Sequence, residues 1–112
     1  MRSAAKPSAL KMMDPHIHMI SRVTDDYARM RDAGIVACVE PAFWLGQPRR
    51  RAGTFFDYFD HMTEFETERA AQFGVKRACA LSLNPREAND EPLAREVLAR
   101  LGDWLDRPSV VA

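Results

Sequence analysis

The chain has 112 residues, of which 46% are hydrophobic and 29% are charged. This composition is typical of one ordinary globular domain and excludes a disordered chain or two separate domains. Sixteen basic and sixteen acidic side chains cancel, which excludes a global positive field that would bind nucleic acid or anionic lipid. An anionic substrate would therefore have to be recognised by a local site.

The N-terminal residues carry Arg2, Lys6 and Lys11 but no continuous apolar stretch. A secretory signal needs such a stretch, and a membrane span needs a longer one. We therefore expect residues 1–10 to form a flexible extension and residues 11–112 to form the folded domain of a cytoplasmic protein without a membrane partner.

Strand and helix patterns alternate along the chain. The expected strands span residues 11–19, 35–39, 75–83 and, as an opening only, 109–112, and the expected helices span residues 24–34, 54–74 and 93–105. Thr24 and Thr54 are the expected N-caps, and Gly34 and Gly74 the expected helix ends. Because no hairpin turn signal separates the strands, the order predicts a parallel sheet covered by helices. A strand that has only begun at the last residue predicts a truncated domain.

The only cysteines, Cys38 and Cys79, lie far apart and inside apolar runs. A zinc knuckle would need a much closer spacing of thiols. We therefore predict two buried thiols rather than a disulfide or a metal site.

Asp14, His16 and His18 alternate on the first expected strand, so their side chains are predicted on one face. Two imidazoles that converge from the carboxyl end of a strand form half of a metal site, because neutral imidazole binds zinc and similar ions. Catalytic groups of (β/α)₈ barrels collect at this end of the strands. The alternative interpretation is a pair of surface histidines without a ligand role.

The motif DPHIH at residues 14–18, followed by this βα order, resembles the TatD-like metal-dependent hydrolases of the amidohydrolase superfamily. The segments FWLGQP at residues 43–48 and SLNP at residues 82–85 resemble a divergent branch of that family. The resemblance implies an α/β fold, the N-terminal part of a (β/α)₈ TIM-type barrel with roughly three and a half βα units and parallel strands. It also implies that His16 and His18 bind one or two divalent ions, such as zinc, magnesium or manganese.

The family takes its other ligands from later strands. The resemblance therefore implies that the remaining ligands and the general base lie beyond residue 112, so that no catalytic residue is assigned in this chain. The implied reaction is attack of metal-activated water on a phosphodiester, amide or ester bond of a small-molecule or phosphodiester substrate. Asn84 stands where the family often has histidine. Asparagine can hydrogen-bond a phosphate or a water but cannot take a proton as imidazole does, which argues against nuclease activity.

Other charged or titratable residues are candidate substrate contacts or structural residues. Glu40 ends the second expected strand, where it would either hold a substrate group or pair with a neighbouring arginine. Arg49, with Arg50 and Arg51, would either bind phosphate in bidentate fashion or remain solvated. His61, within the second expected helix, is predicted to be a surface residue.

A second hypothesis is a catalytically inactive fragment or a non-enzymatic binding module. Two ligands from one strand cannot complete a tetrahedral metal site. An incomplete barrel would also expose sheet edges and favour self-association. A flavodoxin-like domain is disfavoured because residues 19–23 contain no glycine for a phosphate-binding loop.

Overall fold

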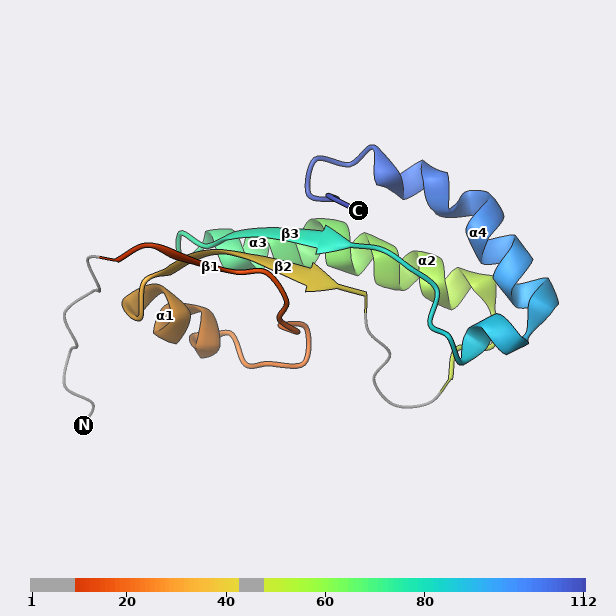
Figure 1. The fold of residues 1–112 in the computed structure, drawn as a ribbon, viewed down its shortest axis with the longest axis horizontal. Coiled ribbons are helices and arrows are strands. Elements are labelled where there is room, and N and C mark those ends of the chain that lie inside the picture. The colour runs from red at the N-terminus through yellow and green to blue at the C-terminus, as the bar shows by residue number, and fades with distance from the viewer. Residues whose placement is uncertain (1–9, 43–47) are drawn as a thin grey trace.

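Strands and helices alternate along the chain in the computed structural model, which describes residues 10–42 and 48–112 (Figure 1). The elements are β1 (Met12–Asp14), α1 (Asp25–Asp32), β2 (Ile35–Pro41), α2 (Ala52–Asp60), the π-helical turn η1 (His61–Phe65), α3 (Glu66–Ala71), β3 (Lys76–Ala80), the 3₁₀ turn η2 (Glu87–Asn89) and α4 (Glu91–Leu105). Nearly all of the expected N-terminal extension, and residues 43–47 of the FWLGQP segment, lie outside the described residues. Within the described part, no helix is long and apolar enough to cross a membrane.

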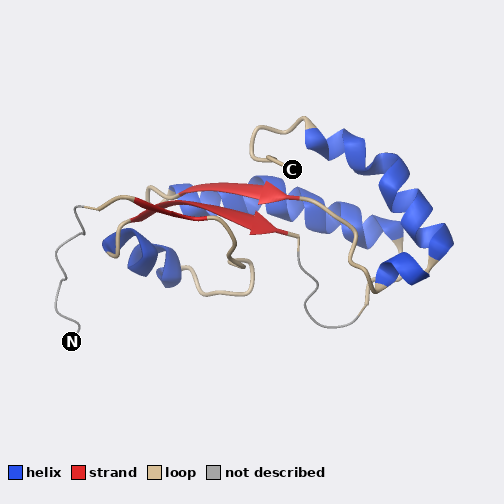
Figure 2. Cartoon of the chain, in the orientation of Figure 1, coloured by secondary structure: helices blue, strands red, loops and turns tan. Residues whose placement is uncertain are grey.

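The strands form one parallel sheet in the order β1-β2-β3 (Figure 2). The C-terminal residues continue this order beside β3. The N–H of Cys79 donates to the carbonyl of Ser109 at 2.8 Å, and the N–H of Val111 donates to the carbonyl of Cys79 at 2.9 Å. An isolated parallel bridge joins Cys79 to Val110. The expected α/β class with parallel strands is confirmed, and a fourth strand begins to pair where the sequence predicts it.

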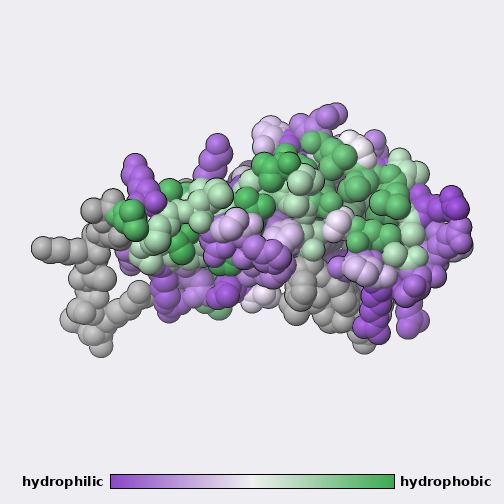
Figure 3. Space-filling view, in the orientation of Figure 1, coloured by the Kyte–Doolittle hydropathy of each residue, from purple (hydrophilic) through white to green (hydrophobic). Residues whose placement is uncertain are grey.

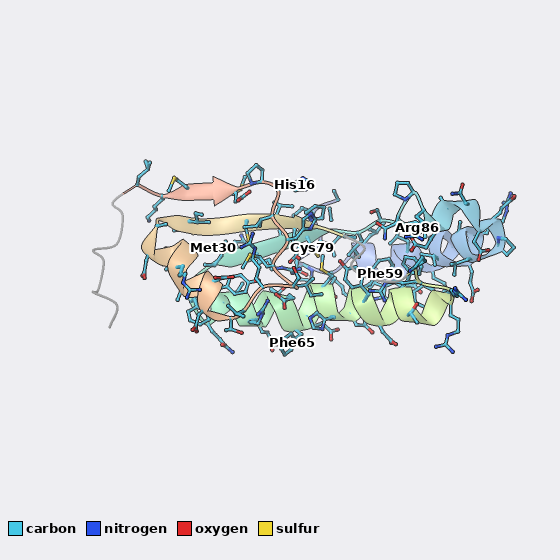
Figure 4. All side chains as sticks on the ribbon, turned by 90° about the horizontal axis from the view of Figure 1, so that it is seen from below. His16, Met30, Phe59, Phe65, Cys79 and Arg86 are labelled. Carbon is cyan, nitrogen blue, oxygen red and sulfur yellow. The ribbon has the colours of Figure 1, made fainter. Side chains whose placement is uncertain are left out.

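The helices α1 and α3 lie on the same face of the sheet, and α2 extends this helix layer past the carboxyl ends of the strands toward α4 (Figure 1 and Figure 4). Alternate side chains of β2 and β3 are buried against this helix layer: Cys38, Glu40, Arg77 and Cys79. The side chains between them, such as Val39 and Ala78, are half-buried on the opposite face. This alternation is that of a sheet with two faces, and it places two charged residues under the helices.

Two apolar clusters fill the space under the helices. One joins α2, α4 and β3 through Phe55, Phe59 and Trp104, and the other joins α1, β2 and α3 through Tyr27 and Ala70. Hydrophobic surface also gathers on the outside, over α4 and the C-terminal segment (Figure 3). Both expected cysteine positions are buried, and both thiols are free.

The expected helix ends at glycine are confirmed. Gly34 and Gly74 have positive φ values of 99° and 71°, a conformation that glycine adopts without a steric penalty. The expected N-caps are confirmed only in part. Thr24 holds the N-cap position of α1 without a capping bond from its side chain. The prediction for Thr54 is wrong, because α2 begins at Ala52 and the Thr54 hydroxyl donates back to the carbonyl of Arg51 at 2.7 Å.

The single helix expected over residues 54–74 contains the π-helical turn η1 in its middle. In this turn the N–H of Glu66 donates to the carbonyl of His61, five residues earlier. The wide turn leaves the carbonyl of Met62 to accept a hydrogen bond from the Arg77 guanidinium. The carbonyl of Thr63 likewise accepts from the Ser109 hydroxyl at 2.9 Å. Side-chain donors from the sheet layer therefore bind carbonyl groups of this turn.

Candidate metal centre

His16 and His18 lie at the carboxyl end of β1, where Figure 4 labels His16. Their ring centroids are 5.2 Å apart and the rings are nearly perpendicular. The His16 residue is exposed and His18 is partly buried. The two imidazoles are close neighbours just beyond the end of β1.

The expected strand over residues 11–19 is too long, because β1 ends at Asp14. Pro15 has no N–H to continue the ladder, and the Asp14 carboxylate accepts the His16 N–H at 3.0 Å, which turns the backbone. The histidines therefore stand on a turn and not on the face of a strand. The Ile17 N–H still reaches the carbonyl of Val39 at 3.1 Å, so the turn remains attached to β2.

Glu40 is fully buried under the helices, and its carboxylate has two groups of partners. One oxygen accepts from the Arg77 guanidinium at 2.8 Å, and the other accepts from the backbone N–H groups of Met19 and Ile20 at 2.7 and 3.0 Å. Of the two interpretations of Glu40, the carboxylate paired with an arginine is therefore the one that the geometry supports. The expectation that it contacts substrate needs correction, because the side chain faces the helix layer with both oxygens engaged.

The Arg49 guanidinium packs on α2. It lies over the Tyr58 ring at 4.6 Å from the centroid and donates to the carbonyl of Thr54 at 3.0 Å. Burial lowers the pKa of Arg49, while Arg50 and Arg51 are exposed. The described contacts of Arg49 are thus structural, and its binding of phosphate stays a prediction.

Asn84 and His61 are distant in sequence from the His16–His18 pair. Asn84 is partly buried in the loop after β3, and its carbonyl accepts the N–H of Ala88 at 3.1 Å. Contact of its side chain with a phosphate or a water stays a prediction. His61 has 42% of its side chain exposed and places Nε2 at 3.5 Å from the buried Glu66 carboxylate, so it is only partly a surface residue.

The chemistry of the donor set fits part of a divalent metal site, since two neighbouring imidazoles suit zinc. No group of three or more histidine, cysteine, aspartate or glutamate side chains that could hold a metal occurs in residues 10–42 and 48–112. The described part of the chain therefore offers the His16–His18 pair and leaves the remaining ligand positions to other groups.

A buried network of charged and polar side chains surrounds the histidine turn, and the sequence patterns described above did not indicate it. Arg69 on α3 donates to the carbonyl of Met19 at 2.7 Å and pairs with Glu66 at 2.9 Å. Tyr27 donates its hydroxyl to Glu66 at 2.9 Å, and burial, with the Glu66 carboxylate beside it, raises the pKa of Tyr27. The sequence feature that could have indicated this network is Arg77, a charged residue inside an otherwise apolar strand pattern, because a buried charge needs a partner.

Cys38 and Cys79 are expected to resist alkylation while the protein is folded. Burial raises the pKa of Cys38 to about 11 and also raises the pKa of Cys79, so little reactive thiolate exists near neutral pH. Because the pKa of Cys38 in the folded protein lies above its ordinary value of 9.0, stability is expected to fall as pH rises from 9.0 toward about 11. Iodoacetamide labelling of the native and the guanidinium-unfolded protein measures the reactivity of the two thiols. Equal labelling rates in the two states would contradict the burial.

No protein-family model and no curated protein sequence matches this chain. Among solved structures, the chain is similar to a TatD-like protein from Archaeoglobus fulgidus, with 26% sequence identity and a TM-score of 0.68. The match covers 80% of this chain but only 37% of that protein's chain, so this chain spans much less than the whole of the related structure. The fold of this chain is therefore similar to one part of a TatD-like protein.

Proposed function

We propose that this chain supplies the first metal ligands of a TatD-like, metal-dependent hydrolase. The observation that carries the proposal is the proximity of His16 and His18, with ring centroids 5.2 Å apart, at the carboxyl end of β1. In barrels of parallel strands, catalytic groups gather at this end. The similarity to a TatD-like protein supports the same class of enzyme.

A divalent ion such as zinc, magnesium or manganese, when bound, would polarise a carbonyl or phosphoryl oxygen and lower the pKa of a coordinated water. His16 and His18 would serve as neutral ligands and not as bases. The general base and the remaining ligands would come from residues outside this sequence. The proposed substrates are phosphodiesters, amides or esters, and Asn84 and Arg49 are the proposed contacts to their polar groups.

A non-enzymatic binding module or inactive fragment is the second candidate function. The ligand count favours it, because the described ranges contain no group of three metal-binding side chains and two ligands hold zinc weakly. The hydrophobic surface over α4 and the C-terminal segment would favour association with a second copy (Figure 3).

The histidine pair is expected to bind zinc in a way that His61, the third histidine of the chain, does not. Changing His16 and His18 together to alanine should raise the zinc dissociation constant at least about tenfold, because both imidazole ligands are lost. The matched variant H61A should bind zinc as the unchanged chain does. Titration of the 112-residue chain with zinc, followed by NMR at the imidazole signals, measures the affinity. The proposal is wrong if the unchanged chain and the double variant bind zinc equally, and the non-enzymatic candidate would then be preferred.

A further inference from the structure

The Glu40–Arg77 ion pair lies under the helix layer with both side chains 0% exposed. Burying two charges is costly, and apolar residues of similar size often stabilise a fold equally well or better. Stability therefore does not explain the pair. The contacts that the pair makes with its surroundings suggest a different role.

The carboxylate of Glu40 binds the chain immediately after the second histidine. Its Oε2 accepts the N–H groups of Met19 and Ile20 at 2.7 and 3.0 Å, and these two amides directly follow His18. Hydrogen bonds from N–H groups to an ionised carboxylate are among the stronger ones in proteins. They fix the direction in which the backbone leaves His18.

Arg77 holds this carboxylate in place from the opposite side. Its Nε and Nη2 both lie 2.8 Å from Oε1 of Glu40. Its Nη1 donates to the carbonyl of Met62 in the π-helical turn. The guanidinium therefore links β3 and the long helix to Glu40, and through Glu40 to the histidine turn.

A second arginine binds the other side of the same peptide segment. Arg69 donates to the carbonyl of Met19 at 2.7 Å and to the carbonyl of Arg22 at 2.9 Å. Met19 is itself 0% exposed. Its N–H is thus bound by Glu40 and its carbonyl by Arg69, so the residue after His18 is fixed by charged groups from two different elements.

We propose that Glu40, held by Arg77, is a positioning residue for the His16–His18 pair. It keeps the turn in the conformation that brings the two imidazoles together, and it touches neither metal nor substrate. The inference rests on the proposed metal-binding function of the pair. A positioning role differs from a purely structural role in its effect on metal binding. Loss of the Glu40 carboxylate should weaken metal binding more than a substitution elsewhere that lowers stability by the same amount.

The test compares E40Q with V97A in the 112-residue chain. Glutamine keeps the shape but loses the charge and one of the two acceptor oxygens. Val97 is 0% exposed in the apolar cluster that joins α2, α4 and β3. Ile20 packs against that cluster, but V97A keeps the Glu40 carboxylate that binds the Met19 and Ile20 amides, so it lowers stability while leaving these hydrogen bonds in place. We expect E40Q to raise the zinc dissociation constant about tenfold or more, to speed hydrogen exchange at the Met19 and Ile20 amides, and V97A to change neither.

A double variant, E40Q/R77M, covers the case in which E40Q alone fails to fold. It removes the carboxylate without leaving the Arg77 charge buried and unpaired. The inference expects the same loss of zinc affinity and the same faster exchange in the double variant. If the unchanged chain binds zinc and both folded variants bind it equally well, the inference is wrong while the proposed function stands. If the unchanged chain binds no zinc, or binds it equally with both ligand histidines changed to alanine, the proposed function fails and the inference fails with it.

Discussion

Replacing Arg77 with alanine is expected to lower the free energy of unfolding by about 3–5 kcal/mol, as breaking a buried ion pair by removing one partner does. The substitution leaves the Glu40 carboxylate buried without its cation and removes a donor from the Met62 carbonyl. It also leaves a cavity under the helix layer, since Arg77 is only 2% exposed. Urea denaturation followed by circular dichroism measures the change.

The matched control for this prediction is R95A. Arg95 pairs with Glu91 on the surface of α4, where the two side chains are 77% and 70% exposed. Such pairs contribute roughly 0–1 kcal/mol, so R95A should leave the urea midpoint nearly unchanged. Equal midpoints for R77A and R95A would show that the buried pair is not formed in solution.

Replacing Phe59 with alanine is expected to cost about 3–5 kcal/mol, the usual range for a fully buried aromatic residue. Phe59 is 0% exposed, and its ring centroid lies 6.2 Å from that of Phe55 and 5.7 Å from that of Trp104. The lost ring would leave a cavity in the apolar cluster between α2 and α4. The midpoint of thermal or urea unfolding measures the effect.

Phe65 provides the matched control, because the same residue type in the same long helix is 57% exposed. Its replacement by alanine should change the free energy of unfolding by no more than about 0.5 kcal/mol. The comparison tests the assignment of the helix faces. If F65A were the more destabilising of the two, the helix would be rotated relative to the sheet.

The order of elements and the location of the core could be predicted because they depend on local patterns. The apolar runs around Cys38 and Cys79 predict buried strands, and both thiols are buried. Gly34 and Gly74 predict helix ends because glycine adopts positive φ more readily than other residues. A pair of histidines at the end of the first strand pattern likewise predicts a site at the carboxyl edge of the sheet. Each of these conclusions needs only the spacing of nearby residues.

The sequence by itself therefore determined the alternation of strands and helices and the parallel sheet, whereas the turn that carries His16 and His18 beyond the end of β1 is seen only in the structure. Only the tertiary structure decided between the two interpretations of Glu40, because its partner Arg77 is 37 residues away and reaches it through the pairing of β2 with β3. The π-helical turn was equally beyond prediction, since the side chains that bind its carbonyls come from residues far away in the sequence. Periodicity reports which face of an element is buried. Which charged groups meet in the buried layer depends on strand register and on the packing of helix against sheet, and neither is a local property.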